Sequence, residues 1–320
     1  MATELERIAA ITARASRPPT EVVLGIGDDG AVLRQHAGSE SVVTTDMLVE
    51  GVHFKLEWMT PELLGRKTIA VSLSDLAAMG ATPRAAFLSV AIPSRLDDGF
   101  VDAFFTGAIS LCDRHGMTLA GGDLSSSPGP FVVNGTLIGE VEAGRAIRRS
   151  GARPGDSVYV SGTLGSSAAG LAQLLAGVTL DTATTGTDLD AIRSHLAPMP
   201  RIELGRALAQ TGLASAAIDI SDGLSSDLRH ICRASGVGAM VEAAALPTSV
   251  SREYALHGGE QYELLFAASP AHAGRIELLA TELRIELSRI GRFEGPPGEI
   301  YLVAENRRTP LEPRGWDHFK

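Results

Sequence analysis

The first half of the chain alternates between stretches with the apolar spacing of amphipathic helices and short apolar runs typical of strands. Apolar positions at helical spacing predict a short helix over 4–15, which ends before a Pro-Pro pair. Apolar runs over 22–24 and 41–45 predict strands, and each leads into a polar loop that contains aspartate. A hydroxyl N-cap at Thr60, a proline directly after it and a terminating Gly80 bound a longer helix.

The alternation continues along the rest of the chain, which predicts the α/β fold class. The pattern predicts a helix over 99–115, a helix that starts at 168–175, and strands over 85–92, 118–120, 131–141, 158–160 and 216–220. The threonine-rich stretch 179–190 is interpreted as an exposed loop, and apolar positions after Gly223 predict a further helix. Gly and Pro cluster in 151–156, which indicates an N-terminal domain over 1–145 and a C-terminal domain over 151–320.

Composition and charge exclude several classes of protein. The 320 residues are 44% apolar and 21% charged, which is typical of soluble globular chains. No apolar run approaches the ~18 residues of a membrane span, and acids occupy the positions where a signal peptide needs basic charge, so we expect a cytoplasmic protein. The net charge of −10 disfavours nucleic-acid binding, and an anionic substrate would need cations beside it. Two distant cysteines, Cys112 and Cys232, exclude a disulfide framework and a four-thiolate zinc site.

Aspartates recur at strand ends, turns and a helix end, and they are the main candidates for chemistry. The set is Asp28, Asp29, Asp46, Asp75, Asp123, Asp219 and Asp222. Each has a structural explanation, because Asp-Gly is common in turns and Asp222 could cap a helix. Asp75 is harder to explain, because the negative end of the helix that stops at Gly80 disfavours a carboxylate there. A bound cation would reverse that effect, while an ion pair with Arg66 or Arg84 remains the structural alternative.

Hydroxyl groups lie beside several of these carboxylates in the sequence. Thr44 and Thr45 precede Asp46, and Ser221 separates Asp219 from Asp222. Hard oxygen ligands of this kind suit Mg²⁺, whereas no pair of His or Cys offers the softer set that zinc prefers. If the aspartates converge, like charges about 4 Å apart repel by ~4 kcal/mol at an effective dielectric of 20, so such a cluster needs metal.

Three further features are weaker candidates. The run Gly162-Thr-Leu-Gly-Ser-Ser167 could offer backbone N–H groups to a phosphate, although a plain strand-to-helix turn explains it as well. His53 is by itself more typical of a structural histidine, and Trp316 of an aromatic side chain that packs on its own domain.

The ordered motifs of the chain resemble those of the thiamine-monophosphate kinase family. They are Gly-Ile-Gly-Asp-Asp, Thr-Thr-Asp, Ser-Asp-Leu-Ala-Ala-Met-Gly, Gly-Gly-Asp, Arg-Ser-Gly-Ala-Arg-Pro-Gly-Asp, Asp-Ile-Ser-Asp-Gly-Leu and Gly-Trp-Asp-His-Phe, from about residue 20 to the end. Each motif is short, but the set in this order is specific. The resemblance implies the two-domain aminoimidazole ribonucleotide synthetase-like fold, with mixed sheets covered by helices. It also implies ATP-dependent phosphorylation of thiamine monophosphate to thiamine diphosphate, and a homodimer joined through the N-terminal domains.

The resemblance also implies a role for individual residues. The expected ligands of several Mg²⁺ ions are Asp28, Thr44, Thr45, Asp46, Asp75, Asp123, Asp219 and Asp222. The residues expected to contact ATP are Phe105, Gly122, Asp123, Arg149 and Ser221. Those expected to contact thiamine monophosphate are His53, Glu260 and Trp316. The expected catalytic residues are Asp46, Asp123, Asp219 and Arg149. Two positions depart from the family pattern, since Phe105 replaces a common tyrosine and Gln261 a frequent aspartate.

The implied reaction is consistent with this acidic residue set. The acceptor phosphate, with a second pKa of about 6, is already largely ionised near neutral pH, so we expect no general base and a direct in-line transfer. Metal ions and Arg149 would screen the anions, and Trp316 would face the cationic thiazolium. Rival enzymes of the same superfamily are selenophosphate synthetase and a hydrogenase maturation protein, which need cysteines near one terminus that this sequence lacks. A non-catalytic nucleotide sensor remains the alternative of a different class, and it would need fewer metal ligands.

Overall fold

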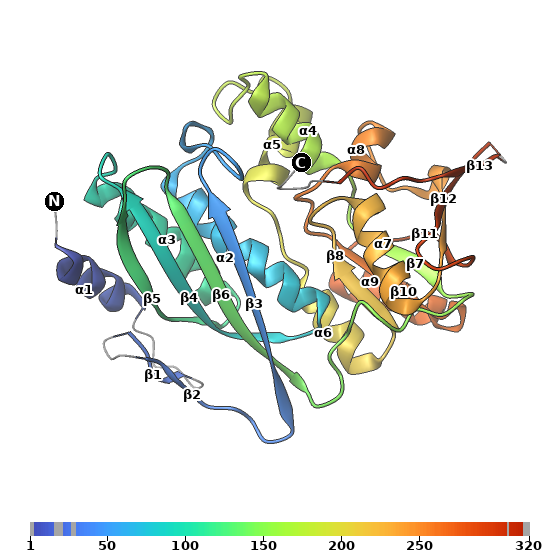
Figure 1. The fold of residues 1–320 in the computed structure, drawn as a ribbon, viewed down its shortest axis with the longest axis horizontal. Coiled ribbons are helices and arrows are strands. Elements are labelled where there is room, and N and C mark those ends of the chain that lie inside the picture. The colour runs from blue at the N-terminus through green and yellow to red at the C-terminus, as the bar shows by residue number, and fades with distance from the viewer. Residues whose placement is uncertain (1–2, 16–21, 27–29, 306, 316–320) are drawn as a thin grey trace. The chain divides into compact units, whose positions relative to one another are not determined.

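The computed structural model describes residues 3–15, 22–26, 30–305 and 307–315. The chain divides into two compact units, which are described separately below (Figure 1). Unit 1 comprises Met1–Leu76 and Thr82–Gly144, and unit 2 comprises Ala77–Ala81 and Arg145–Lys320. Within the described residues, no helix has the length and apolar character that a bilayer crossing requires.

Unit 1 is built on a four-stranded mixed sheet in the order β3-β6-β4-β5. Its strands are β3 (Ser39–Val49), β4 (Thr82–Pro93), β5 (Thr118–Ser127) and β6 (Val132–Glu142). β4 and β5 run parallel, while β6 pairs antiparallel with β3 and β4. The remaining elements are α1 (Glu4–Ala15), β1 (Val22–Leu24), β2 (Val32–Leu33), a 3₁₀ turn at Leu56–Trp58, α2 (Pro61–Ala78) and α3 (Asp98–Arg114).

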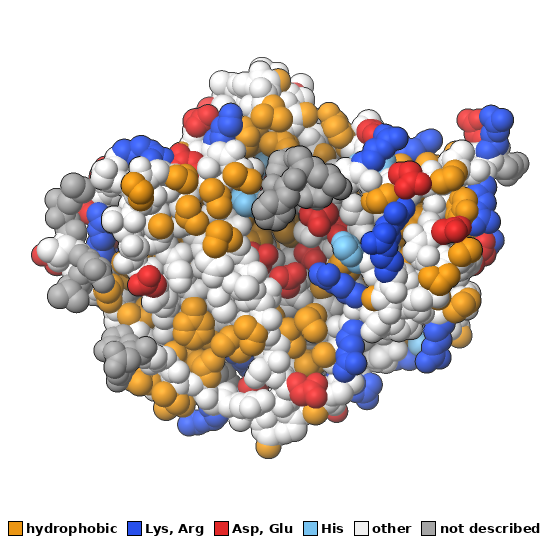
Figure 2. Space-filling view, in the orientation of Figure 1, with side chains coloured by type: hydrophobic (Ala, Val, Ile, Leu, Met, Phe, Trp, Pro, Cys, Tyr) orange, Lys and Arg blue, Asp and Glu red, His pale blue; other side chains and the backbone are white. Residues whose placement is uncertain are grey.

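Helices α2 and α3 cover one face of this sheet (Figure 1). They approach each other backbone to backbone, because a Cβ on Gly65 would lie 1.9 Å from the carbonyl oxygen of Phe104, and one on Gly107 would lie 2.0 Å from that of Glu62. Only glycine permits such contact. On the opposite face the β1–β2 segment packs against β4 and β5, whereas β3 is open, with Val43 61% and Met47 56% exposed. Hydrophobic side chains gather over the strands of unit 1 in Figure 2.

Unit 2 is built on a seven-stranded sheet in the order β13-β12-β9-β11-β7-β10-β8. Its strands are β7 (Ser157–Ser161), β8 (Ala216–Asp219), β9 (Ala239–Glu242), β10 (Leu264–Ala268), β11 (Leu287–Phe293), β12 (Ile300–Ala304) and β13 (Arg307–Pro310). Its helices are α4 (Ser166–Leu175), α5 (Gly186–Leu196), α6 (Ile202–Thr211), α7 (Leu224–Ser235), α8 (Arg252–His257) and α9 (Ala273–Leu283), with 3₁₀ turns at Ala243–Ala245 and Pro270–His272. The central strands β7, β8 and β10 are buried along their whole length.

The expected loop over 179–190 is wrong in its second half, because α5 begins at Gly186. Thr185 caps this helix by a reciprocal pair of hydrogen bonds. Its hydroxyl accepts from the Asp188 N–H at 3.1 Å and donates to the Asp188 carboxylate at 2.7 Å. This is the Ser/Thr-x-x-acid pattern that begins helices, and the many threonines before it obscured the signal.

Candidate active site

Two of the predicted metal ligands, Asp46 and Asp75, lie together in unit 1. Asp46 comes from β3 and Asp75 from the last turn of α2. The Ser72 hydroxyl donates to the Asp46 carboxylate at 2.7 Å, and the Thr44 hydroxyl donates to the Asp75 carboxylate. Burial, and then the nearby charge of Asp75, raise the pKa of Asp46 to about 6. Asp75 is therefore part of a half-buried carboxylate pair, not the exposed carboxylate of the structural alternative.

This pair has the properties of a site for a hard divalent cation. The groups around it are carboxylate and hydroxyl oxygens, the donors that Mg²⁺ prefers. The raised pKa of Asp46 shows that its negative charge is poorly compensated by the protein. A cation between the two carboxylates would offset both the burial and the repulsion. Thr44, Asp46 and Asp75 thus fit the metal that the sequence indicates.

Thr45 and Asp123 lie on the other face of the same sheet. Asp46 pairs in register with Gly135, which pairs with Leu88, on the helix-covered face. Thr45 points the opposite way, and its hydroxyl contacts Asn134 at 3.0 Å. Asp123 pairs in register with Ser89 on β4, in the row of Asn134, so its side chain also belongs to the open face. This arrangement therefore does not place the side chains of Thr45 and Asp123 beside an ion held by Asp46.

A cavity of about 690 Å³ lies beside Asp123 in unit 1. Its walls are mostly apolar and come from α1, α3, β4, β5 and the segment around Gly25. They include the expected nucleotide contacts Phe105, Gly122 and Asp123. Gly122 has φ 152°, and a Cβ there would lie 2.0 Å from the carbonyl oxygen of Leu88, so this position requires glycine. The volume and lining are those of a small-molecule pocket.

His53 lies in unit 1 just after β3. Its Nδ1 accepts a hydrogen bond from the Val49 N–H at 3.0 Å, which fixes the ring. An Nδ1 that accepts carries no proton, so the neutral ring has its N–H at Nε2.

The second group of predicted residues lies in unit 2, on the loop between β8 and α7. Asp219 ends β8 and is buried, Ser221 and Asp222 follow it, and Gly223 precedes the helix. Partial burial, and then the positive charge of Arg149, lower the pKa of His230 on α7, and Asp222 acts on the same ring in the opposite sense. Arg149 is therefore within electrostatic range of this loop. The structure thus places Asp219, Ser221 and Asp222 on one loop, and the charges of Arg149 and Asp222 both act on His230 beside it.

Glu260 is held directly against this loop. Its N–H donates to the Ser221 carbonyl at 2.7 Å, and the next two residues donate to the Ile220 carbonyl. Glu260 has φ 53°, a left-handed conformation that costs energy for a residue with a side chain. Its carboxylate lies 3.4 Å from Nδ1 of the buried His195 on α5. The expected thiamine monophosphate contact is therefore next to the expected metal loop.

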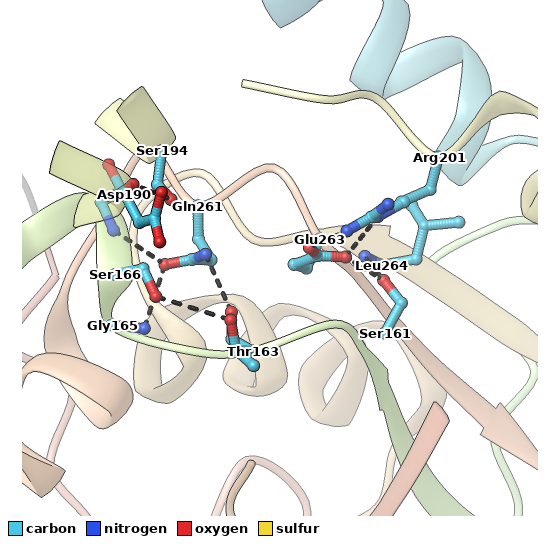
Figure 3. A network of polar contacts seen from close by, with 11 residues as sticks. Ser161, Thr163, Gly165, Ser166, Asp190, Ser194, Arg201, Gln261, Glu263 and Leu264 are labelled. Atoms are coloured by element: carbon cyan, nitrogen blue, oxygen red, sulfur yellow. Dashed lines mark hydrogen bonds and ion pairs between the residues drawn. The ribbon is translucent and has the colours of Figure 1, made fainter. Parts of the chain in front are cut away.

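Gln261 connects the same segment to the Gly162–Ser167 run (Figure 3). Its carbonyl oxygen accepts from the N–H groups of Gly165 at 3.0 Å and Ser167 at 3.4 Å, and its amide nitrogen donates to the Thr163 carbonyl at 2.9 Å. An aspartate could accept the two N–H groups but could not donate the third bond. These bonds occupy N–H groups at the start of α4 that were predicted as possible phosphate donors.

Beside this network, Arg201 binds Glu263 through two parallel contacts, Nε to Oε2 at 2.6 Å and Nη2 to Oε1 at 2.5 Å (Figure 3). Ser161 donates to the same carboxylate and accepts from the Leu264 N–H at 2.8 Å. These bonds connect the end of β7 to the residues that directly precede α6 and β10.

The C-terminal segment reaches the same helix end. The N–H of Gly315 donates to the Ser226 hydroxyl at 3.1 Å, and a Cβ on Gly315 would lie 2.4 Å from the Asp222 carbonyl oxygen. Asp28 and Trp316 lie outside the described residues.

Comparisons with known proteins agree with this two-unit division. Residues 27–141 match the model of the AIR synthase related protein, N-terminal domain, and residues 153–303 match that of the C-terminal domain. The thiamine-monophosphate kinase of Salmonella typhimurium is 39% identical over 99% of this chain and 98% of its own, and that of Bacillus subtilis is 36% identical over 99% of both. The chain belongs to the thiamine-monophosphate kinase family.

Solved structures of this family have the same fold. Thiamine-monophosphate kinase from Stenotrophomonas maltophilia superposes with a TM-score of 0.83 at 39% identity, covering 95% of this chain and 96% of that one. AaThiL complexed with AMPPCP and TMP gives a TM-score of 0.78 at 33% identity, covering 100% of this chain and 99% of that one. The expected two-domain fold and the family assignment are confirmed. The hydrogenase maturation protein HypE, at 18% identity and a TM-score of 0.77, shares the fold.

Sequence reasoning missed three residues that this family member places around the loop of unit 2. Asp227 accepts hydrogen bonds from the loop itself, His195 contacts Glu260, and Ser226 contacts the C-terminal segment. Of the three, Asp227 was the easiest to identify from the sequence, because an acid in the first turn after a glycine N-cap is a helix-start signal. His195 lies in a helix that the sequence did not reveal.

Proposed function

We propose that this chain transfers the γ-phosphoryl group of ATP to thiamine monophosphate and so produces thiamine diphosphate and ADP. The observation that carries the proposal is the likeness over the full chain, at 33% identity, to a structure complexed with AMPPCP and TMP. AMPPCP is an ATP analogue, and TMP in a protein of this family denotes thiamine monophosphate. The acidic pair of unit 1 and the acidic loop of unit 2 supply the carboxylates that such a reaction uses.

Several Mg²⁺ ions take part in the proposed reaction. Bound Mg²⁺ would neutralise charge on the phosphates and help to align donor and acceptor. In unit 1, Thr44, Asp46 and Asp75 would hold metal, and in unit 2 Asp219 and Asp222 would do so. Asp28, Thr45 and Asp123 complete the proposed set on the family resemblance. For Thr45 and Asp123 the sheet geometry favours contacts on the open face, to nucleotide or to a separate ion.

The chain's own residues would bind and align the two anions. The cavity that contains Phe105, Gly122 and Asp123 would take part of the nucleotide, and Arg149 and Ser221 would contact its phosphates. His53, Glu260 and Trp316 would contact thiamine monophosphate, with Trp316 facing the cationic thiazolium. The acceptor phosphate is largely ionised near neutral pH, so no side chain needs to remove a proton. Transfer is then direct and in line, with Asp46, Asp123, Asp219 and Arg149 as the catalytic set.

We further propose a cytoplasmic homodimer. The N-terminal domain, residues 1–145, would bind nucleotide and metal and form the dimer contact, and residues 151–320 would complete the active site. The open face of the unit 1 sheet, with Val43 and Met47 exposed on β3, supports a contact between two copies. No nucleic-acid or membrane partner is proposed.

The test is a comparison of phosphate acceptors. Purified protein is incubated with Mg·ATP and either thiamine monophosphate or thiamine, and the products are separated chromatographically. The proposal expects thiamine diphosphate and ADP in equal amounts with thiamine monophosphate, and ADP at no more than the blank rate with thiamine. ADP formation that does not depend on thiamine monophosphate, or no product at saturating substrates, would reject it.

A further inference from the structure

Asp227, in the first turn of α7, is a buried carboxylate to which the proposed reaction assigns no role. It is 1% exposed. Its Oδ2 accepts two backbone hydrogen bonds, from the Asp222 N–H at 3.1 Å and from the Gly223 N–H at 3.0 Å. Both donors belong to the loop that carries Asp219, Ser221 and Asp222. The side chain therefore reaches backwards from the helix to hold the loop.

The N-cap residue of α7 cannot provide this contact. Gly223 has φ 113°, and a Cβ there would lie 2.7 Å from the carbonyl oxygen of His257. A serine or aspartate at this position, the usual source of a cap, would therefore be strained and would clash. Asp227 supplies the hydrogen-bond acceptor that position 223 lacks.

The location of Asp227 has an electrostatic cost that a structural cap alone would avoid. Asp227 is buried, its Oδ2 is hydrogen-bonded to the backbone of Asp222, and the charges of Asp219 and Asp222 act on it. A neutral side chain that accepts hydrogen bonds could cap the helix without adding a third carboxylate beside two others.

The loop is held from two sides. Asp227 binds the N–H groups of Asp222 and Gly223, while the Glu260 N–H binds the Ser221 carbonyl at 2.7 Å from the opposite direction. These bonds fix the backbone on both sides of the Asp222 Cα. A backbone that is already fixed loses little further conformational freedom when its side chain binds a ligand, so binding costs less entropy.

We propose that Asp227 is a positioning residue, which holds the Asp219–Gly223 loop through two backbone hydrogen bonds so that Asp222 is oriented toward a divalent cation. This inference rests on the proposed function, because that function gives the loop its metal. The competing hypothesis is that Asp227 binds the metal directly. Asp222, Asp227 and His230 do have potential ligand atoms within 4.8 Å of one another.

Two substitutions separate positioning from direct binding. In Asp227→Asn, the carboxamide oxygen can still accept both N–H bonds, while the negative charge is lost. In Asp227→Ala, both bonds are lost. Asp190→Asn and Asp190→Ala, at an exposed position of α5, are the matched controls. All proteins are titrated with Mn²⁺ in the presence of AMPPCP and followed by electron paramagnetic resonance, which needs no turnover.

Positioning predicts that Asp227→Ala weakens Mn²⁺ binding by roughly 10- to 100-fold, the usual effect of losing a group that orients a ligand. Asp227→Asn should stay within about threefold of the wild type, because both backbone bonds remain. Hydrogen–deuterium exchange should be faster over residues 220–226 in Asp227→Ala and unchanged in Asp227→Asn. The controls should match the wild type in both measurements.

Equal weakening of Mn²⁺ binding in both Asp227 variants would overturn the inference in favour of direct ligation, and wild-type binding in Asp227→Ala would overturn it outright. Should Asp227→Ala fail to fold, Asp227→Glu is the substitute, since it keeps the charge but moves the carboxylate by one methylene group. Wild-type Mn²⁺ affinity and exchange in Asp227→Glu would contradict positioning. Failure of the proposed function is distinguishable, because it appears as absent kinase activity in the wild type.

Discussion

Asp46 shows how a carboxylate that is proposed to bind metal can reduce the stability of the chain that carries it. Burial and the nearby charge of Asp75 raise the pKa of the Asp46 carboxyl group to about 6. A folded-state pKa above the unfolded value means that the folded protein retains the proton up to a higher pH than the unfolded chain does. As pH rises from about 4 to above 6, the group therefore loses stabilisation relative to the unfolded chain, by about 3 kcal/mol at most.

We therefore predict that Asp46→Asn is more stable than the wild type in metal-free buffer above pH 6. The gain should be on the order of 1–3 kcal/mol and should vanish below about pH 3, where the wild-type carboxyl is protonated in both states. Urea unfolding at several pH values in EDTA measures it. Lower stability of Asp46→Asn at pH 7 would contradict the assigned environment.

Trp316 and Gly315 give a second prediction at the scale of residues. Trp316→Ala should raise the KM for thiamine monophosphate several-fold and leave that for ATP little changed, since an aromatic contact with a cation is worth about 1–2 kcal/mol. Gly315→Ala should act in the same direction, because its Cβ would meet Ser226 Oγ at 2.3 Å and displace the segment. Steady-state kinetics with each substrate varied in turn measure both. An unchanged KM for thiamine monophosphate in Trp316→Ala would give the aromatic a purely structural role.

At the scale of elements, the close contact of α2 and α3 positions Asp75 relative to β3. Gly65→Ala would place a Cβ 1.9 Å from a backbone oxygen of α3, and backbone cannot rotate away as a side chain can. We expect destabilisation by at least about 2 kcal/mol, within or above the usual cost of overpacking. Gly274→Ala on α9, where a Cβ would meet nothing within 4 Å, is the control and should be neutral or slightly stabilising. The midpoints of thermal unfolding of the two variants and the wild type measure this difference. Equal midpoints for Gly65→Ala and Gly274→Ala would contradict the close packing of α2 and α3.

At the scale of the whole molecule, the open sheet face predicts the assembly. Lysine at both Val43 and Met47 would place four like charges in a symmetric contact between two copies. We expect the wild type to sediment as a dimer and Val43→Lys/Met47→Lys as a monomer that keeps its circular dichroism spectrum. A monomeric wild type, or a dimeric double variant, would show that this face is not the interface.

The sequence predicted most elements because their signals are local. The helix over 4–15 has the bounds of α1, and Thr60, Pro61 and Gly80 correctly bounded α2. β3 is longer than predicted, because the polar residues Thr44, Thr45 and Asp46 interrupt its apolar positions. The aspartates could be identified from the sequence, but the sheet faces on which they lie could not. That Thr45 and Asp46 point to opposite sides follows from strand alternation, whereas the side on which Asp123 lies depends on pairings between distant strands.

The central claim is that carboxylates distant in the sequence hold divalent ions against a nucleotide. The most direct measurement counts Mn²⁺ ions bound to the wild type, Asp46→Asn and Asp219→Asn in the presence of AMPPCP. Equilibrium dialysis gives the number bound, and circular dichroism checks the fold. The account predicts more than one ion in the wild type and fewer, or far more weakly bound, ions in each variant. The same number of ions at the same affinity in all three proteins would contradict it.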